Sequence, residues 1–343
     1  MQARAFITGV SGPKLSAAER EFIRSERPWG FILFKRNIET PRQVALLVLE
    51  LRETVEVPDA PVLIDQEGGR VQRLGPPHWP VYPPGALFGA LYDMDQTLGL
   101  SAARLSARLI AADLGDLGVS VGCLPLADVP VAGADAVIGD RAYGTRPEKV
   151  AAIARAVAEG LAQGGILPVL KHIPGHGRAT ADSHFGLPVV RTSKKELEVT
   201  DFAAFQPLAD LPMAMTAHVV FSALDPVHPA TTSATIIEQV IRGVIGFQGL
   251  LMSDDLSMNA LPGSIAERTR AIFSAGCDIV LHCNGKLEEM RAVAPETPEL
   301  WGKALERARR ALASRRAPQP FDRVASRAEL DALIDRAGAA EGA

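Results

Sequence analysis

Short apolar runs alternate with longer amphipathic stretches along most of this chain. Runs of this length are typical of buried strands, whereas the Ala/Leu/Arg/Glu-rich stretches between them are typical of helices. We expect strands at Ala5–Thr8, Gly30–Phe34, Val62–Asp65, Val119–Leu124, Ile166–Lys171, Ala214–His218, Leu250–Asp254 and Asp278–His282. We expect helices at Ser16–Arg27, Pro41–Thr54, Gln96–Leu117, Pro147–Gln163, Lys194–Ala209, Thr232–Ile245 and Ser264–Ala275.

Eight strands that each lead toward a helix predict parallel pairing and an α/β fold, a single-domain (β/α)8 TIM-type barrel. A doubly wound sheet is the alternative, but Gly9-Val10-Ser11-Gly12 only weakly resembles the glycine-rich fingerprint expected after its first strand. We expect residues 1–296 to form the catalytic barrel and residues 297–343 a C-terminal helical appendage packed on it. Its helices are predicted at Glu299–Arg315 and Ser326–Gly338.

The composition excludes several classes of protein. The net charge is −4 and the basic residues form no stripe, so nucleic-acid binding has little support. Three cysteines without CxxC spacing, Cys123, Cys277 and Cys283, indicate reduced thiols rather than a disulfide framework. The first residues lack the apolar core of a signal peptide, and no apolar run approaches the roughly 20 residues that span a bilayer. We therefore expect a cytoplasmic protein that binds no membrane.

Polar residues end most of the predicted strands. In a parallel barrel the carboxyl ends of all strands share one rim, which is where active sites are built. The residues at these ends are Asp65, Asp128, Lys171, His172, His218, Asp254 and His282.

The segment from Lys171 to His184 is the richest in chemistry, because it holds three of the seven histidines of the chain. Asp182 and His184 are two residues apart, so in an extended loop the carboxylate can accept the imidazole N–H and raise the basicity of the histidine. The alternative is an Asx-turn beside a surface histidine. Gly175 and Gly177 favour a loop that can swing over a pocket.

Two further carboxylate motifs allow more than one interpretation. Asp254 and Asp255 follow a predicted strand, and either one could attack a carbon centre, whereas Asp255 or Ser253 could instead cap the next helix. Asp65 leaves a strand into a glycine turn followed by arginines. It could accept sugar hydroxyls or form an ion pair that braces the loop. The segment Val137–Gly144 is a polar stretch that is weak evidence alone.

Together these segments resemble the bacterial cytoplasmic β-N-acetylglucosaminidases of glycoside hydrolase family 3, the single-domain type used in cell-wall recycling. The resemblance depends on four motifs in the order of the family. They are DQEGGRVQR (Asp65–Arg73), IGDR (Ile138–Arg141), KHIPGHGRATADSH (Lys171–His184) and SDDLSM (Ser253–Met258). Ile173, where the family often has phenylalanine, and the segment Gly122–Asp128 depart from the pattern without removing a catalytic group.

The resemblance implies a retaining hydrolase that removes terminal β-linked N-acetylglucosamine from N-acetylglucosaminyl-1,6-anhydromuramyl peptides, through a covalent glycosyl-aspartate intermediate. It assigns Asp254 as the nucleophile and His184 as the acid/base with Asp182 as its partner. The positions that match sugar-binding residues of the family are Asp65, Arg73, Arg141, Lys171 and His172. It further implies a monomer that needs no cofactor and no metal and whose partner is a small sugar substrate.

Two rival functions stay open. A metal-dependent barrel hydrolase could draw ligands from His172, His176, Asp182, His184, His218 and His282. Against it, the first strand does not end in a His-x-His pair, and Lys171 would repel a cation bound beside it. A sugar-binding sensor without turnover is disfavoured because Asp254, Asp182 and His184 are all present.

Overall fold

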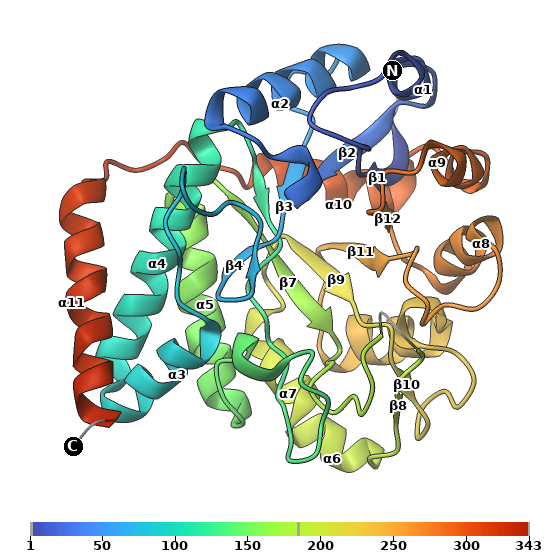
Figure 1. Cartoon of the computed structure of the whole chain (residues 1–343). Helices are drawn as coiled ribbons and strands as arrows, with labels where there is room; N and C mark the ends of the chain where they lie inside the picture. Colours follow the sequence, from blue (N-terminus) through green and yellow to red (C-terminus); the bar gives the residue numbers. More distant parts are fainter. Residues whose placement is uncertain (1–2, 184–185, 342–343) are drawn as a thin grey trace.

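Eight parallel strands close into a barrel (Figure 1) in this computed structural model, which describes residues 3–183 and 186–341. Around the barrel the strand order is β1-β12-β11-β9-β7-β6-β3-β2. The barrel strands are β1 (Arg4–Thr8), β2 (Pro28–Leu33), β3 (Val62–Ile64), β6 (Val121–Gly122), β7 (Leu167–Ile173), β9 (Met213–Thr216), β11 (Leu250–Asp255) and β12 (Ile279–His282). Each lies within or beside a segment predicted from the apolar runs, so the (β/α)8 barrel is confirmed.

Helices surround the barrel, and two of the predicted ones begin at a capping box. The hydroxyl of Ser16 accepts the N–H of Glu19, and Ser264 and Glu267 repeat this arrangement. The helices are α1 (Ala17–Glu26), α2 (Pro41–Val55), α3 (Gly85–Met94), α4 (Gln96–Asp116), α5 (Pro147–Gln163), α6 (Lys194–Val199), α7 (Asp201–Phe205), the π-helix η5 (Ile236–Val244), α8 (Ile265–Ala275), α9 (Leu287–Val293), α10 (Gly302–Ala313) and α11 (Arg323–Glu341). Within the described chain, none of these helices combines the length and apolar character needed to cross a membrane.

Short elements fill the connections between the main ones. The 3-10 helices are η1 (Lys35–Asn37), η2 (Gly139–Arg141), η3 (Gln206–Leu208), η4 (Ala230–Thr232) and η6 (Ala294–Glu296). Two small sheets lie outside the barrel: the antiparallel hairpin of β4 (Gln66–Gly68) and β5 (Val71–Gln72), and the parallel pair of β8 (Val189–Val190) and β10 (Val220–Phe221). The β4–β5 hairpin directly follows β3, so it stands on the rim where the predicted site lies.

The helical prediction missed α9 (Leu287–Val293) and was wrong in two further places. The segment Lys194–Ala209 is not one helix, because Thr200 leaves helical geometry and its hydroxyl donates to the carbonyl of Glu196. Helix α3 was not predicted, since Gly85 and Gly89 in its first turns are helix-breaking residues. Both glycines are needed for packing: a Cβ atom would lie 2.2 Å from the carbonyl oxygen of Arg141 at Gly85 and 2.1 Å from that of Tyr143 at Gly89. Helix α3 is therefore fitted tightly to a loop of the site.

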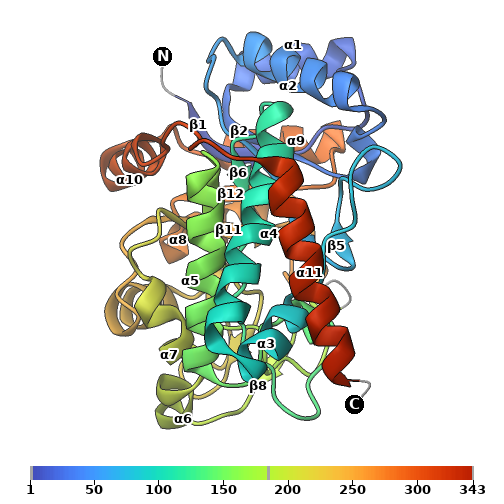
Figure 2. The same ribbon diagram turned by 90° about the vertical axis from the view of Figure 1, so that its left-hand side faces the viewer.

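The C-terminal segment closes the end of the barrel opposite the rim. The N–H of Ala5 donates to the carbonyl of Pro298, and Leu300 donates back to Ala3, which ties the segment to the start of β1. Ala308 and Ala311 of α10 are buried in the apolar cluster that also contains the inward side chains of the strands. Helix α11 lies along α4 (Figure 2). The expected boundary at residue 296 stays a prediction, but α10 shares its apolar side chains with the barrel.

Candidate active site

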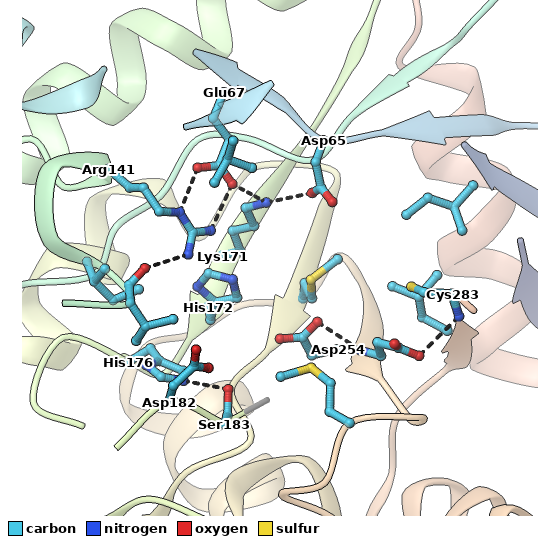
Figure 3. A pocket seen from close by; sticks show the side chains of 18 of the residues that line it. Asp65, Glu67, Arg141, Lys171, His172, His176, Asp182, Ser183, Asp254 and Cys283 are labelled. Atoms are coloured by element: carbon cyan, nitrogen blue, oxygen red, sulfur yellow. Dashed lines mark hydrogen bonds and ion pairs between the residues drawn. The ribbon is translucent and has the colours of Figure 1, made fainter. Parts of the chain in front are cut away.

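The predicted site residues meet at one cavity of about 270 Å³ at the carboxyl ends of the strands (Figure 3). The residues on its wall that had been predicted from the sequence are Asp65, Arg73, Arg141, Lys171, His172, Asp182 and Asp254. His184 lies outside the described residues, so its pairing with Asp182 stays a prediction. The barrel therefore brings together side chains from segments almost 200 residues apart.

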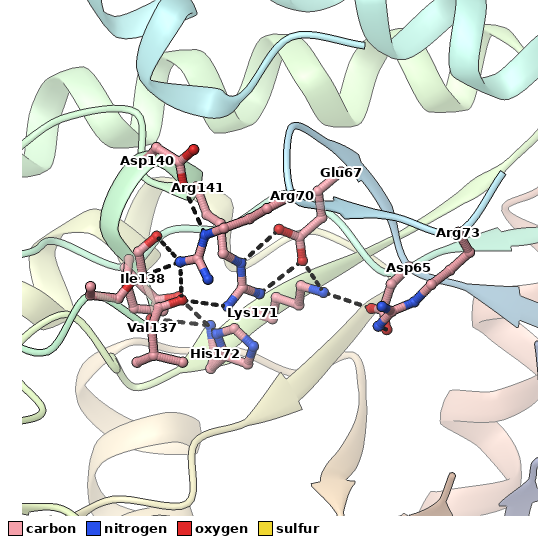
Figure 4. A network of polar contacts seen from close by, with 12 residues as sticks. Asp65, Glu67, Arg70, Arg73, Val137, Ile138, Asp140, Arg141, Lys171 and His172 are labelled. Atoms are coloured by element: carbon pink, nitrogen blue, oxygen red, sulfur yellow. Dashed lines mark hydrogen bonds and ion pairs between the residues drawn. The ribbon is translucent and has the colours of Figure 1, made fainter. Parts of the chain in front are cut away.

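One wall of the cavity is a network of buried charges centred on Lys171 (Figure 4). The Nζ atom of Lys171 lies 2.9 Å from Oδ1 of Asp65 and 2.6 Å from Oε1 of Glu67. Arg141 binds the same Glu67 through two nitrogens, with Nε and Nη2 at 2.8 and 2.9 Å from the carboxylate oxygens. Each charge is thus neutralised before any ligand enters, which keeps these donors and acceptors in place.

Asp65 is held in its charged form by this network. Its Oδ2 accepts from Nη2 of Arg73 at 2.8 Å, while Oδ1 contacts Lys171. Burial acts to raise the pKa of the Asp65 carboxyl, but Lys171 and Arg73 together bring that pKa well below its ordinary value. Burial likewise acts to lower the pKa of Lys171, and Asp65 and Glu67 reverse that effect. The Asp–Arg pair is confirmed by the contact with Arg73. The binding of sugar hydroxyls by Asp65 stays a prediction, and the side chain lies on the cavity wall.

Two loops that form this wall, the β4–β5 turn and the segment 136–141, are joined by hydrogen bonds and ion pairs. The Nη2 of Arg70, in the β4–β5 turn, donates to the carbonyls of Ala136 and Val137 at 2.6 and 2.7 Å. Its Nε donates to Asp140 at 2.9 Å (Figure 4). The Glu67–Arg141 pair joins the same two loops from the inside. The polar stretch at 137–144, weak evidence in the sequence, becomes one side of the site through these contacts.

His172 is oriented by a fully buried carboxylate. Its Nδ1 lies 2.8 Å from Oδ2 of Asp128, and the backbone N–H of His176 donates to Oδ1 of Asp128 at 2.7 Å. Burial acts to raise the pKa of Asp128, but His172 and His176 bring it below its ordinary value, so Asp128 is ionised. The proton of His172 is thus kept on Nδ1, and Nε2 is the nitrogen available to a bound molecule.

His176 and Ser183 connect the start of the histidine-rich loop to its end. The Nε2 of His176 lies 3.1 Å from Oγ of Ser183, and both side chains are buried. Burial and the neighbouring His172 lower the pKa of His176 to about 4, so its ring is neutral at pH 7. Ser183 directly follows Asp182, so this contact holds Asp182 at the cavity wall.

Asp254 and Asp255 differ in what holds them. Both oxygens of the Asp255 carboxylate are engaged: Oδ1 accepts the N–H groups of Ser257 and Cys283, each at 3.0 Å, and Oδ2 accepts the Ser257 hydroxyl. The Asp254 carboxylate accepts the N–H of Asp255 at 2.8 Å. Burial acts to raise the pKa of Asp254, but His218, His172 and this N–H lower it below its ordinary value. Asp254 is thus an ionised carboxylate at the cavity wall.

The alternative that Asp255 or Ser253 caps the next helix is wrong. Helix α8 begins after Ser264, which supplies its own cap. Ser253 instead accepts the N–H of Leu281 on the neighbouring strand at 3.0 Å. The paired aspartates therefore serve the rim of the barrel and not a helix terminus.

Not every polar strand end contributes to the cavity wall. Asp128, His218 and His282 lie behind it, where His218 contacts the carbonyl of Asp255 and His282 contacts Glu289. Within residues 3–183 and 186–341, no three His, Cys, Asp or Glu side chains are grouped in a way that could hold a metal ion. Of the histidines proposed as metal ligands, His172 and His176 line the cavity, whereas His218 and His282 lie behind it.

Glu67 and Asp128 both organise the site, although no partner was predicted for either of them. Glu67 follows Asp65 by two residues, and residues at that spacing in an extended segment project to the same side. That spacing was a usable signal. Asp128 ends its strand as the other polar residues do, but its partner His172 is 44 residues away in the chain. Only the adjacency of β6 and β7 reveals that pair.

Comparisons with known proteins show which family the chain matches. Residues 3–307 match the N-terminal domain of glycosyl hydrolase family 3. A β-hexosaminidase of Alkalilimnicola ehrlichii is 39% identical over 295 residues, which cover 85% of this chain and 83% of that protein. NagZ from Neisseria gonorrhoeae, solved in complex with N-trifluoroacetyl-D-glucosamine, superposes with a TM-score of 0.84 at 30% identity and 98% coverage of both chains. A family 3 β-N-acetylglucosaminidase from Paenibacillus superposes with a TM-score of 0.84 at 28% identity, and the match covers 97% of this chain and 66% of that longer chain.

Proposed function

This chain belongs to glycosyl hydrolase family 3 and is a glycoside hydrolase of the β-hexosaminidase type, and we propose that it releases terminal β-linked N-acetylglucosamine with retention of configuration. The observation that carries the proposal is the single cavity with an ionised Asp254 on one wall and the Lys171 network on another. The N-trifluoroacetyl-D-glucosamine bound to the Neisseria relative supports an N-acylated amino sugar as the ligand.

The size of the cavity supports removal of one sugar at a time. Pockets that take drug-sized ligands are about 300–1,000 Å³. A cavity of about 270 Å³ is below that range and fits one sugar ring. Asp65, Arg141, Lys171 and His172 would hold the hydroxyl groups of that ring, because they offer charged donors and acceptors that are fixed in advance.

Asp254 would act as the nucleophile. Glycoside cleavage passes through an oxocarbenium-like state that needs an anion beneath the anomeric carbon and a proton for the leaving oxygen. The Asp254 oxygen would bond to the anomeric carbon as the glycosidic bond breaks. Asp255 is less suited to this role, because its two carboxylate oxygens are already occupied by donors from Ser257 and Cys283.

His184 would act as the acid and base, with Asp182 as its partner. In the first half-reaction it would give its proton to the leaving oxygen. In the second it would take a proton from the water that attacks the anomeric carbon and frees Asp254. The position of Asp182 on the cavity wall supports this assignment.

The natural substrate proposed is an N-acetylglucosaminyl-1,6-anhydromuramyl peptide of peptidoglycan recycling. This part of the proposal comes from the family motifs, as do the cytoplasmic location, the monomeric state and the lack of a cofactor. Mass spectrometry of the products from such a fragment would test it. Release of N-acetylglucosamine together with the intact anhydromuramyl peptide is the expected result, and an unchanged fragment would contradict it.

The first experiment measures nitrophenol release from an aryl β-N-acetylglucosaminide by the wild type and by Asp254→Asn, with and without a strong chelator. We expect the wild type to turn over the substrate regardless of chelator and the variant to lose at least about 10³-fold in kcat. Loss of wild-type activity on chelation would favour the metal-dependent hydrolase. Tight binding of N-acetylglucosamine without any hydrolysis would favour the sensor.

A further inference from the structure

A chain of buried polar groups leads from the end of β9 to Asp254. The hydroxyl oxygens of Thr216 and Thr231 lie 2.8 Å apart, and the Thr231 oxygen lies 2.7 Å from Nδ1 of His218. The Nε2 of His218 lies 3.0 Å from the carbonyl oxygen of Asp255, whose own N–H donates to Asp254 at 2.8 Å. Thr216, Thr231 and His218 are fully buried, and none of them lines the cavity.

The chemistry of the partners sets the direction of these hydrogen bonds. A carbonyl oxygen only accepts hydrogen bonds, so Nε2 of His218 is protonated and its N–H donates a hydrogen bond to the carbonyl of Asp255. Burial lowers the pKa of His218 below its ordinary value. The Thr231 hydroxyl donates to the carbonyl of Ala217 at 3.0 Å, so its oxygen is held in place beside Nδ1 of His218.

Asp255 is held at every polar group that it has. Its side chain accepts from Ser257 and Cys283, and its N–H is directed at Oδ1 of Asp254. Its carbonyl accepts from His218 and from the N–H of Met258. His218 lies in the loop after β9, so its bond reaches the Asp255 main chain from another part of the rim. This bond therefore helps to fix the Asp255–Leu256 peptide, which adjoins the peptide whose N–H binds Asp254.

We propose that His218 is a positioning residue for the nucleophile, which acts by holding the Asp255 main chain so that its N–H binds Oδ1 of Asp254 and leaves Oδ2 for the anomeric carbon. The inference rests on the proposed function, because it takes Asp254 as the nucleophile. In both half-reactions Asp254 forms or breaks its bond to the sugar, so a displaced carboxylate slows both. A misplacement of about 1 Å is enough to cost about 10²-fold in rate.

The test compares His218→Leu with His218→Gln on an aryl β-N-acetylglucosaminide. Glutamine can keep a side-chain N–H donor for the Asp255 carbonyl, whereas leucine cannot. We expect His218→Leu to lose about 10²-fold in kcat with KM changed less than threefold, and His218→Gln to recover at least tenfold of that loss. Sugar binding is expected to be kept, because His218 does not line the cavity that the sugar would occupy.

His282→Leu is the matched control. His282 is also a fully buried histidine at the end of a barrel strand, and its Nε2 contacts Glu289 rather than the Asp255 main chain. If the two leucine variants lose kcat equally, or if glutamine is no better than leucine at position 218, the inference is overturned. Thermal unfolding of each variant shows whether the comparison is between folded proteins.

Thr231→Val provides a second test should His218→Leu not fold. It leaves His218 in place but removes the hydroxyl that binds Nδ1, and a fall in kcat of about tenfold is expected from the loosened ring. An unchanged kcat would overturn the inference. Failure of the proposed function gives a different result, because the wild type itself would then be inactive.

Discussion

Two buried aspartates at opposite ends of the barrel are each held by two cations. At the rim, Asp65 contacts Lys171 and Arg73, and its side chain is 16% exposed. At the closed end, Asp278 contacts Arg242 and Arg307, both at 2.8 Å, and its side chain is 5% exposed. The Asp278 carboxylate also accepts the N–H of Leu251 at 2.9 Å.

The two aspartates differ in what the cations around them connect. Arg307 belongs to α10 and Arg242 to the π-helix η5, so Asp278 joins three elements into one folded unit. Lys171 and Arg73 instead hold Asp65 beside an open cavity, where a carboxylate can still accept hydroxyl groups. A similar ionic arrangement thus stabilises the fold at one end and prepares a binding site at the other.

Of the further substitutions, His184→Ala is expected to have the largest effect on turnover. General acid help of this kind contributes about 10²–10⁴-fold, and poor leaving groups need the proton most. We therefore expect a loss in that range on a sugar leaving group and a smaller loss on nitrophenol, with little change in thermal stability. Equal losses on both substrates would count against the acid role.

Asp278→Asn should show the opposite behaviour. Removing the charge leaves Arg242 and Arg307 buried without their anion, which typically costs about 3–5 kcal/mol in the free energy of unfolding. At a temperature where the variant is folded, its kcat/KM should equal that of the wild type. Denaturant unfolding and a rate assay measure the two quantities, and a lower kcat/KM in the folded variant would break the comparison.

Asp65→Asn is the corresponding substitution at the rim and is compared with Asp278→Asn. Charged hydrogen bonds are worth about 1.5–3 kcal/mol, so the loss of the carboxylate should lower kcat/KM by about 10²-fold. Stability should fall less than in Asp278→Asn, because Lys171 keeps Glu67 and Arg73 is partly exposed. If Asp65→Asn destabilises the protein more and leaves turnover intact, Asp65 braces its loop and does not bind sugar.

The smallest effect expected is the dependence of stability on pH at His176. Its folded pKa of about 4 lies below the roughly 6.5 of an unfolded chain, so the unfolded state binds more protons between these values. Stability from this group is therefore lost as pH falls from 6.5 toward 4, by about 2 kcal/mol at pH 5.

The measurement compares the free energy of unfolding at pH 7 and pH 5. His176→Gln should lose about 2 kcal/mol less than the wild type over this interval, since glutamine does not titrate. Asp278→Asn is the control, because it keeps His176 and should lose as much as the wild type. Equal losses in all three proteins would show that the His176 ring is not held neutral.

The strands and the rim could be predicted because their signals are local. The apolar run that precedes Lys171, for example, becomes the buried strand β7, and a polar residue at the end of such a run lies on the rim. Helix α3 and the break at Thr200 could not be predicted, since both depend on contacts with distant loops. Gly85 is tolerated in a helix because the Arg141 carbonyl occupies the place of its side chain.

Local patterns along the chain are enough to predict the barrel, to recognise the family motifs and to identify the chemical types gathered at the rim. They leave Asp254 and Asp255 equivalent by spacing, and they indicate no partner for Glu67 or Asp128. The folded chain shows that Glu67 pairs with Lys171 and Arg141, that Asp128 orients His172, and that Asp255 is bound by Ser257 and Cys283. The physical reason is that a charge or a hydrogen-bonding group has many possible partners along a chain, and barrel closure selects the few that come within about 3 Å.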